Sequence, residues 1–206
     1  MTGPSVIHDT FTIGRSYPAA PSRVFAAFAT AEAKSTWGDT GDLEPADGQA
    51  GLAEFDFRAG GRECFGIKMQ GTTYRYDARY YDIVPDQRII YAYEMYADDT
   101  RISVSVATIE FTEDAAGTAL TWTEQGAYLD GIDGPQAPSL REEGTAEMLD
   151  GLARYLARKP RPDGGDRIPR RCTVKPQPHQ STLLNGPFPA PLAAYQISAL
   201  SVSFDL

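Results

Sequence analysis

The sequence predicts an α+β fold in which a curved antiparallel sheet of six to seven strands wraps around a long C-terminal helix. Segments that alternate between apolar and polar residues recur between residues 53 and 129, separated by short turns rich in Gly, Pro or Asp. This spacing indicates an antiparallel meander. A long amphipathic segment follows at 139–159. Helices do not alternate with the strands, so a parallel nucleotide-binding sheet is not expected.

The N-terminal part predicts one strand followed by two short helices. The strand is expected at Phe11–Tyr17 and the first helix at Pro21–Ala29, with proline in its first turn. Thr30 is placed to cap a second helix at Ala31–Trp37. The acidic, Gly-rich segment 38–51 is interpreted as a solvated loop, because its acids do not have the spacing of a calcium-binding EF-hand loop.

The rest of the sheet is expected from strands whose limits follow the turn residues. Gly60-Gly61 is predicted to be a two-residue hairpin turn. Alternate residues of a strand share a face, so each strand offers one row of side chains to the core. The predicted strands are Ala53–Ala59, Arg62–Met69, Thr72–Val84, Arg88–Tyr96, Arg101–Phe111 and Thr118–Leu129.

The long helix is predicted at Ser139–Lys159 and is expected to lie across the concave face of the sheet. Ser139 and Glu142 have the spacing of a capping box, and Glu142 with Glu143 would place acids in the first turn. Pro160 is expected to end the helix. One apolar stripe recurs at helical spacing: Met148, Leu149, Leu152, Tyr155 and Leu156.

The composition of the chain restricts which partners the protein can bind and in which cellular compartment it is expected. The net charge of −9 argues against binding to nucleic acid or to an anionic membrane. No apolar run reaches membrane-spanning length, and the N-terminus lacks the features of a signal peptide. Cys64 and Cys172 lack metal-site spacing and are interpreted as free thiols of a reducing compartment. A cytoplasmic protein is therefore expected.

Two regions are predicted along the chain. Residues 1–159 are expected to form one folded domain. Residues 160–206 are rich in Pro and Gly and are interpreted as a disordered or loosely attached extension. A shifted-frame or read-through origin of this extension stays open.

Motifs of catalysis and cofactor binding do not occur in the sequence. His8 and His179 are its two histidines and lie far apart, which argues against nucleophile–histidine chemistry. No zinc spacing, P-loop or dinucleotide fingerprint occurs, so no cofactor or metal is expected. Enzymatic activity is left undecided, and it would have to use tyrosine hydroxyls, Glu124 or Asp77 in a desolvated pocket.

The candidate binding residues are mainly aromatic and lie on strands and on the long helix. Seven of the 11 tyrosines fall between residues 74 and 96. They either line a cavity on the concave face or are ordinary strand residues with hydroxyls in solvent. The candidates are Trp37, Phe55, Phe57, Tyr74, Tyr76, Tyr91, Tyr93, Met95, Trp122, Glu124, Met148 and Leu152.

Two of these candidates, and also Arg58, have an interpretation that concerns structure alone. Glu124 shares a strand face with Trp122, which would place a carboxylate against apolar walls. The commoner outcome for such a glutamate is to bend out to water, and we favour it. Trp37 is expected to pack in the core rather than stack on a ligand. Arg58 is expected to bond a turn carbonyl or an acid.

Several segments of the chain carry a resemblance to a known family. The most specific is the hairpin Phe57-Arg58-Ala59-Gly60-Gly61, and the turn Pro85 to Ile89 is next. The others are PSRVFAAFATAEAKSTWG at 21–38, GTALTWTEQG at 117–126 and MLDGLARYL at 148–156. Together they resemble the SRPBCC superfamily, which includes START and Bet v allergen-like proteins with the helix-grip fold, in its branch of activator-of-heat-shock-protein-ATPase homologues.

The resemblance implies a cavity-bearing domain and leaves three functions open. The favoured one is binding of a small hydrophobic molecule between the sheet and the C-terminal helix. The first alternative is an enzyme like the polyketide cyclases and dehydratases, using Tyr and Glu in the cavity. The second is a protein-binding module like the chaperone-ATPase activators. A homodimer and a chaperone partner also remain open, because the fold alone does not choose among these functions.

Overall fold

The computed structural model describes residues 4–38, 54–69 and 71–158, which form a seven-stranded antiparallel sheet with three helices. The loop predicted at 38–51 lies almost wholly outside these residues, as do Cys172, Pro160 and the extension at 160–206. No helix within the described ranges has the length and apolar character needed to cross a membrane.

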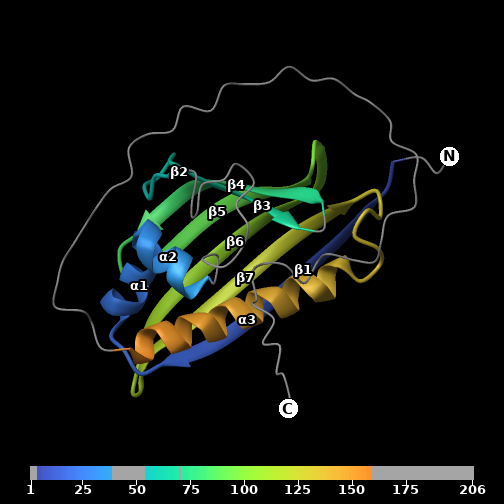
Figure 1. The fold of residues 1–206 in the computed structure, drawn as a ribbon. Coiled ribbons are helices and arrows are strands. Elements are labelled where there is room, and N and C mark those ends of the chain that lie inside the picture. The colour runs from blue at the N-terminus through green and yellow to red at the C-terminus, as the bar shows by residue number, and fades with distance from the viewer. Residues whose placement is uncertain (1–3, 39–53, 70, 159–206) are drawn as a thin grey trace, which may run out of the picture.

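The strands are joined in the spatial order β1-β7-β6-β5-β4-β3-β2, and all neighbours are antiparallel (Figure 1). This arrangement, with two short helices after β1 and one long helix at the end, confirms the predicted fold class. The elements are β1 (Val6–Tyr17), α1 (Pro21–Ala29), α2 (Ala31–Trp37), β2 (Glu54–Phe55), β3 (Arg62–Met69), β4 (Thr72–Val84), β5 (Arg88–Ala97), β6 (Thr100–Asp114), β7 (Gly117–Leu129) and α3 (Ala137–Ala157).

The long helix α3 packs on one half of the sheet. It contacts β1, β7 and α2, and Figure 1 shows it running along β1 and β7. We call the sheet face toward α3 the inner face. Its predicted apolar stripe is confirmed: Leu149, Leu152 and Leu156 are buried, and Met148 and Tyr155 pack partly buried against the same core. The other half of the sheet, formed by β3, β4 and β5, lies beyond these main contacts of α3.

The second strand is shorter than predicted. It comprises Glu54–Phe55 alone, and the turn before β3 is longer than a two-residue hairpin. The amide of Asp56 donates to the carbonyl of Arg62 at 2.8 Å, and the amide of Gly61 donates to the carbonyl of Arg58 at 2.8 Å. A Cβ at Gly61 would lie 2.0 Å from the Asp56 carbonyl oxygen, so this tight turn requires glycine there.

The start of α3 also differs from the prediction. The helix begins at Ala137, with Pro138 in its first turn, and Ser139 donates its hydroxyl to the carbonyl of Gln136 at 3.0 Å. The capping box of Ser139 and Glu142 is therefore wrong, and the first turn contains no acid. Proline suits the first turn because its missing N–H needs no partner there, so the helix starts ahead of the serine.

The short helices match their predicted limits. Thr30 caps α2 by accepting from the amide of Ala33 at 3.2 Å. Trp37 ends α2 and is buried in the core, where its indole N–H donates to the carbonyl of Ala27 at 2.7 Å. The expectation that Trp37 packs in the core is confirmed.

Candidate functional site

The four tyrosines of β4 and β5 that were predicted as binding residues are buried. Tyr74, Tyr76, Tyr91 and Tyr93 are at most 9% exposed. Tyr76, Tyr91 and Tyr93 form a continuous set of rings, with centroids 5.0 Å apart between Tyr76 and Tyr93 and 5.9 Å apart between Tyr91 and Tyr93. The interpretation as strand residues with hydroxyls in solvent is therefore wrong for these four tyrosines, whereas Tyr81, at 63% exposure, agrees with it.

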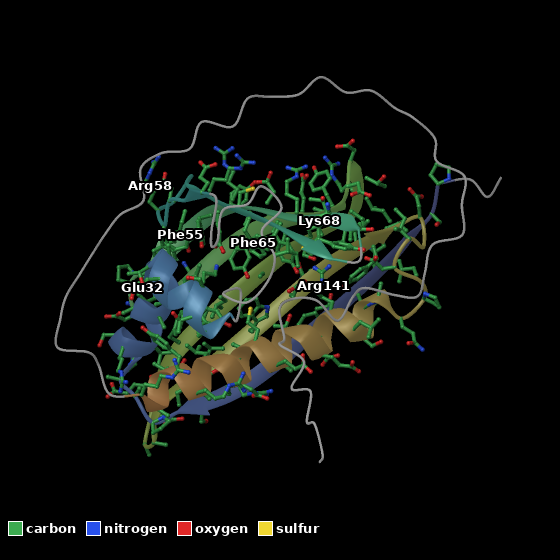
Figure 2. The ribbon with its side chains drawn as sticks, in the orientation of Figure 1. Glu32, Phe55, Arg58, Phe65, Lys68 and Arg141 are labelled. Atoms are coloured by element: carbon green, nitrogen blue, oxygen red, sulfur yellow. The ribbon has the colours of Figure 1, made fainter. Side chains whose placement is uncertain are left out.

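A buried polar cluster, which we call the Arg141 network, joins α3 to the sheet. It consists of Tyr93, Ser103, Glu124 and Arg141. Tyr93 donates its hydroxyl to Glu124 Oε1 at 2.5 Å. Arg141 donates to the Tyr93 hydroxyl at 2.5 Å and to Ser103 Oγ at 3.0 Å, and it lies 3.7 Å from Glu124. Figure 2 shows Arg141 between α3 and the sheet.

Glu124 is fully buried, at 0% exposure. The interpretation that it bends out to water is wrong. Its strand, β7, is paired on both sides, so residue parity directs the side chain inward beside Trp122. Arg141 and the Tyr93 hydroxyl compensate the buried carboxylate, because a charge away from water is tolerated only with such partners.

A second buried polar cluster, the Lys34 network, lies under α2. It consists of Lys34, Glu63 and Tyr80. Lys34 Nζ and the Tyr80 hydroxyl each lie 2.5 Å from Glu63 Oε2. The ammonium also lies 5.8 Å from the Tyr80 ring centroid and 5.7 Å from that of Tyr91. Both carboxylates of the two networks are thus paired with a cation of their own.

The buried phenols stay protonated. Burial raises the pKa of Tyr76, Tyr80, Tyr91 and Tyr93 well above the ordinary value of 10.0. For Tyr93, Arg141 opposes that rise in pKa and Glu124 adds to it. At neutral pH these groups are therefore neutral donors and acceptors of hydrogen bonds.

The remaining predicted candidates lie at different depths. Trp122 and Leu152 are buried in the core, whereas Met95 and Met148 are partly exposed beside it. Phe55 and Phe57 lie near the turn before β3 and stack with centroids 6.1 Å apart, and Phe57 packs on Tyr80. Most of the candidate set is brought to the inner face, but Trp37 serves core packing.

Sequence reasoning missed Lys34, Ser103, Glu63 and Arg141. A signal existed for two of them. Arg141 lies four residues before Thr145, on the helix face that continues to the buried stripe. Glu63 has the strand parity of Phe65, which stacks on Tyr76. Lys34 was not apparent, because its position depends on how α2 meets the sheet.

The outer face of the sheet carries charged pairs around a shallow hollow of about 490 Å³. Asp77 lies there, with ion pairs to Arg62 at 2.6 Å and Arg75 at 3.2 Å. The suggestion of Asp77 as an acid in a desolvated interior pocket is therefore wrong. Arg58 bonds Asp56 at 2.9 Å, as expected for a structural arginine.

Fold and site together define a helix-grip domain with a polar, tyrosine-rich interior. The model of the family described as "Activator of Hsp90 ATPase homolog 1-like protein" matches residues 18–157. The chain belongs to this family, which is part of the SRPBCC superfamily.

Solved structures agree with this assignment. An uncharacterised protein from Rhizobium leguminosarum is 40% identical, with a TM-score of 0.68, and the match covers 77% of this chain and 100% of that one. Protein Mll3558 from Rhizobium loti is 45% identical, with a TM-score of 0.65, over 73% of this chain and 99% of that one. CV1439 from Chromobacterium violaceum, at 24% identity and TM-score 0.56 over 73% of this chain and 99% of that one, shares the fold. The comparison with curated proteins found no match.

Proposed function

We propose that this protein binds a small apolar or aromatic molecule on the inner face, between the sheet and α3. The observation that carries the proposal is a set of apolar side chains that pack against the core and keep part of their surface exposed. They are Phe65 on β3, Met95 on β5 and Met148 on α3. Exposed apolar surface next to buried polar groups is typical of ligand sites.

The composition of β6 supports the same position. The first part of its inner row is Ser103, Ser105 and Ala107, all small and buried, and it is followed by the large buried side chains of Ile109 and Phe111. Across the sheet, Ser105 is paired with the buried Tyr93 of β5, and Ser103 is paired with the buried Tyr128 of β7. Small side chains between rings on both neighbouring strands leave room above β6, where a flat aromatic ligand would lie against the rings.

Native mass spectrometry of freshly purified full-length protein tests the proposal. We expect an added mass that disappears under denaturing conditions, or binding of naphthalene when the purified protein carries none. Met148→Glu should abolish the bound mass, because it places a charge at the exposed apolar surface. The matched control is Ala153→Glu, at an exposed position of the same helix. Absence of both a co-purified mass and naphthalene binding would contradict the proposal.

The Tyr93–Glu124 pair favours a second candidate, an enzyme that acts on a hydrophobic, polyketide-like substrate. The Tyr93 phenol is neutral and its hydroxyl lies 2.5 Å from Glu124, with Arg141 donating to the same hydroxyl. In the loss of water from an aldol adduct, this pair would take up the α-proton and return it to the departing hydroxyl, which leaves as water. Arg141 would stabilise the negative charge that develops on the carbonyl oxygen.

Loss of water from the aldol adduct of benzaldehyde and acetone, followed by absorbance, tests this second candidate. We expect turnover by the protein and a loss of about 100-fold in Tyr93→Phe. Tyr155→Phe, which removes a hydroxyl from α3 outside the Arg141 network, is the control. An equal rate in the protein and in Tyr93→Phe would argue against catalysis by this pair.

The chaperone-partner alternative requires an exposed apolar patch away from the inner face. Tyr81 and Val106 are exposed, at 63% and 41%. The hollow beside Tyr81 is lined by charged residues such as Arg62 and Glu94. A surface of mixed charges is not the apolar patch that a chaperone partner requires. The inner face therefore supports binding of a small molecule better than the outer face supports a chaperone partner.

A further inference from the structure

Among the described residues, two buried hydroxyls on the inner face have no partner at normal hydrogen-bond geometry. They are Ser105 Oγ and the Tyr128 hydroxyl, in residues that are 1% and 4% exposed. A weak hydrogen bond with Ser105 is one of the causes that lower the pKa of the Tyr93 phenol, so the Tyr128 hydroxyl is the observation that carries the inference. A buried hydroxyl without a partner carries a free-energy cost, which a bound polar group would remove.

The two hydroxyls converge on one corner of the inner face. Ser105 is paired across the sheet with Gly126. A Cβ placed on Gly126 would lie 2.9 Å from the Tyr128 hydroxyl oxygen. The Tyr128 side chain therefore lies over Gly126, which brings its hydroxyl to the strand position next to Ser105. We call Ser105, Gly126 and Tyr128 the hydroxyl corner.

The charges around the hydroxyl corner disfavour an ionised ligand of either sign. Arg141 lies 5.7 Å from the Tyr128 ring centroid and repels a cation. The positive charge of Arg141 is already balanced by Glu124 at 3.7 Å, so Arg141 does not need a bound anion. Asp133 is a further acid in this region, 8% exposed, and it adds repulsion to any anion. An ionised group would also lose its hydration on entering.

We propose that the hydroxyl corner binds an uncharged hydrogen-bonding group, a hydroxyl or carbonyl, on an apolar or aromatic ligand. This inference rests on the proposed function and specifies the ligand class for the same site. Two neutral hydroxyls can each donate or accept, so they can satisfy either group. The apolar part of the ligand would then lie against the small inner side chains of β6.

Four related compounds test this inference on the full-length protein at neutral pH. They are naphthalene, naphthol, naphthoate and naphthylmethylammonium, with dissociation constants measured by calorimetry. We expect naphthol to bind roughly fivefold tighter than naphthalene, the effect of one net hydrogen bond. Both ions should bind more weakly than naphthol.

Tyr128→Phe should remove the advantage of naphthol while naphthalene binding stays the same. Its unfolding midpoint without ligand should be unchanged or higher, because the lost hydroxyl has no partner. Tyr155→Phe is the matched control and should keep the advantage.

The outcomes separate this inference from the proposed function. Tighter binding of either ion than of naphthol would overturn the uncharged ligand class but leave the site in place. An unchanged preference for naphthol in Tyr128→Phe would mean that the hydroxyl corner holds only water, which also overturns the inference. Failure of all four compounds to bind would contradict the proposed function and, with it, this inference.

Discussion

Arg141 is a buried cation whose position depends on Glu124. Arg141 is 2% exposed and Glu124 is 0% exposed. Neither charge is tolerable alone in this interior, because removal of one partner leaves the other uncompensated. The pair therefore sets a strong constraint on the relative position of α3 and β7.

Arg141→Met should lower the free energy of unfolding by about 3–5 kcal/mol, because it leaves the buried Glu124 carboxylate without a cation. The double variant Arg141→Met, Glu124→Gln should recover much of that loss. Urea unfolding of both variants measures the difference. Arg15→Met, which breaks the more exposed pair with Asp150, is the control and should cost no more than about 1 kcal/mol. Equal losses in the single and double variants would contradict the argument.

Asp133 makes stability depend on pH. Burial raises the pKa of its carboxyl above the ordinary 3.8, although Arg141 lowers it. Because the folded protein holds this proton more strongly than the unfolded chain, its contribution to stability is complete below pH 3.8. That contribution is lost as pH rises from the unfolded pKa through the folded pKa, at about 1.4 kcal/mol per pH unit between the two values.

Asp133→Asn removes this titration. Relative to the unaltered protein, the variant should gain stability as pH rises from about 4 to about 7. Urea unfolding at a series of pH values measures the difference. Asp99→Asn, at an exposed turn, is the control for the substitution itself. A difference that stays constant with pH would show that Asp133 does not carry the effect.

At the scale of elements, α2 and α3 meet through a glycine. A Cβ on Gly151 would lie 2.3 Å from the carbonyl oxygen of Trp37. The close approach lets α3 lie against the end of α2, and it explains a glycine inside a helix, where it is otherwise unfavourable.

Gly151→Ala should destabilise the protein even though alanine is favoured over glycine in helices by about 1 kcal/mol. The clash is with backbone, so α2 or α3 must shift. Thermal unfolding provides the measurement. Gly14→Ala on β1 is the matched control, since a Cβ there meets nothing within 4 Å. An unchanged or raised unfolding midpoint in Gly151→Ala would contradict the close contact.

At the scale of the whole molecule, the division at residue 159 stays a prediction. The family model ends at residue 157, and the Rhizobium leguminosarum relative is matched over its full length by 77% of this chain. A chain that ends at Arg158 should keep the same circular dichroism spectrum, with an unfolding midpoint within about 3 °C. A large drop would show that residues 159–206 stabilise the domain. The homodimer also stays a prediction, which sedimentation of the same two chains would test.

Much of the fold was predictable because local rules and the global fold agree. The helices Pro21–Ala29 and Ala31–Trp37 have the limits that their proline and Thr30 indicate. Strand parity correctly placed Tyr91 and Tyr93 on one face. The errors arose where two local signals compete, as at the start of α3, where Pro138 overrode the serine cap.

The sequence by itself determined most of the elements, the antiparallel meander and the strand face that Tyr91 shares with Tyr93, because periodicity and turn chemistry act over a few residues. Only the tertiary structure decided that Glu124 is buried with Arg141 and that Lys34 meets Glu63. These pairs join residues far apart in the chain, so no local pattern specifies them. Each charge can be buried only because the packing of a helix on the sheet brings its partner within reach.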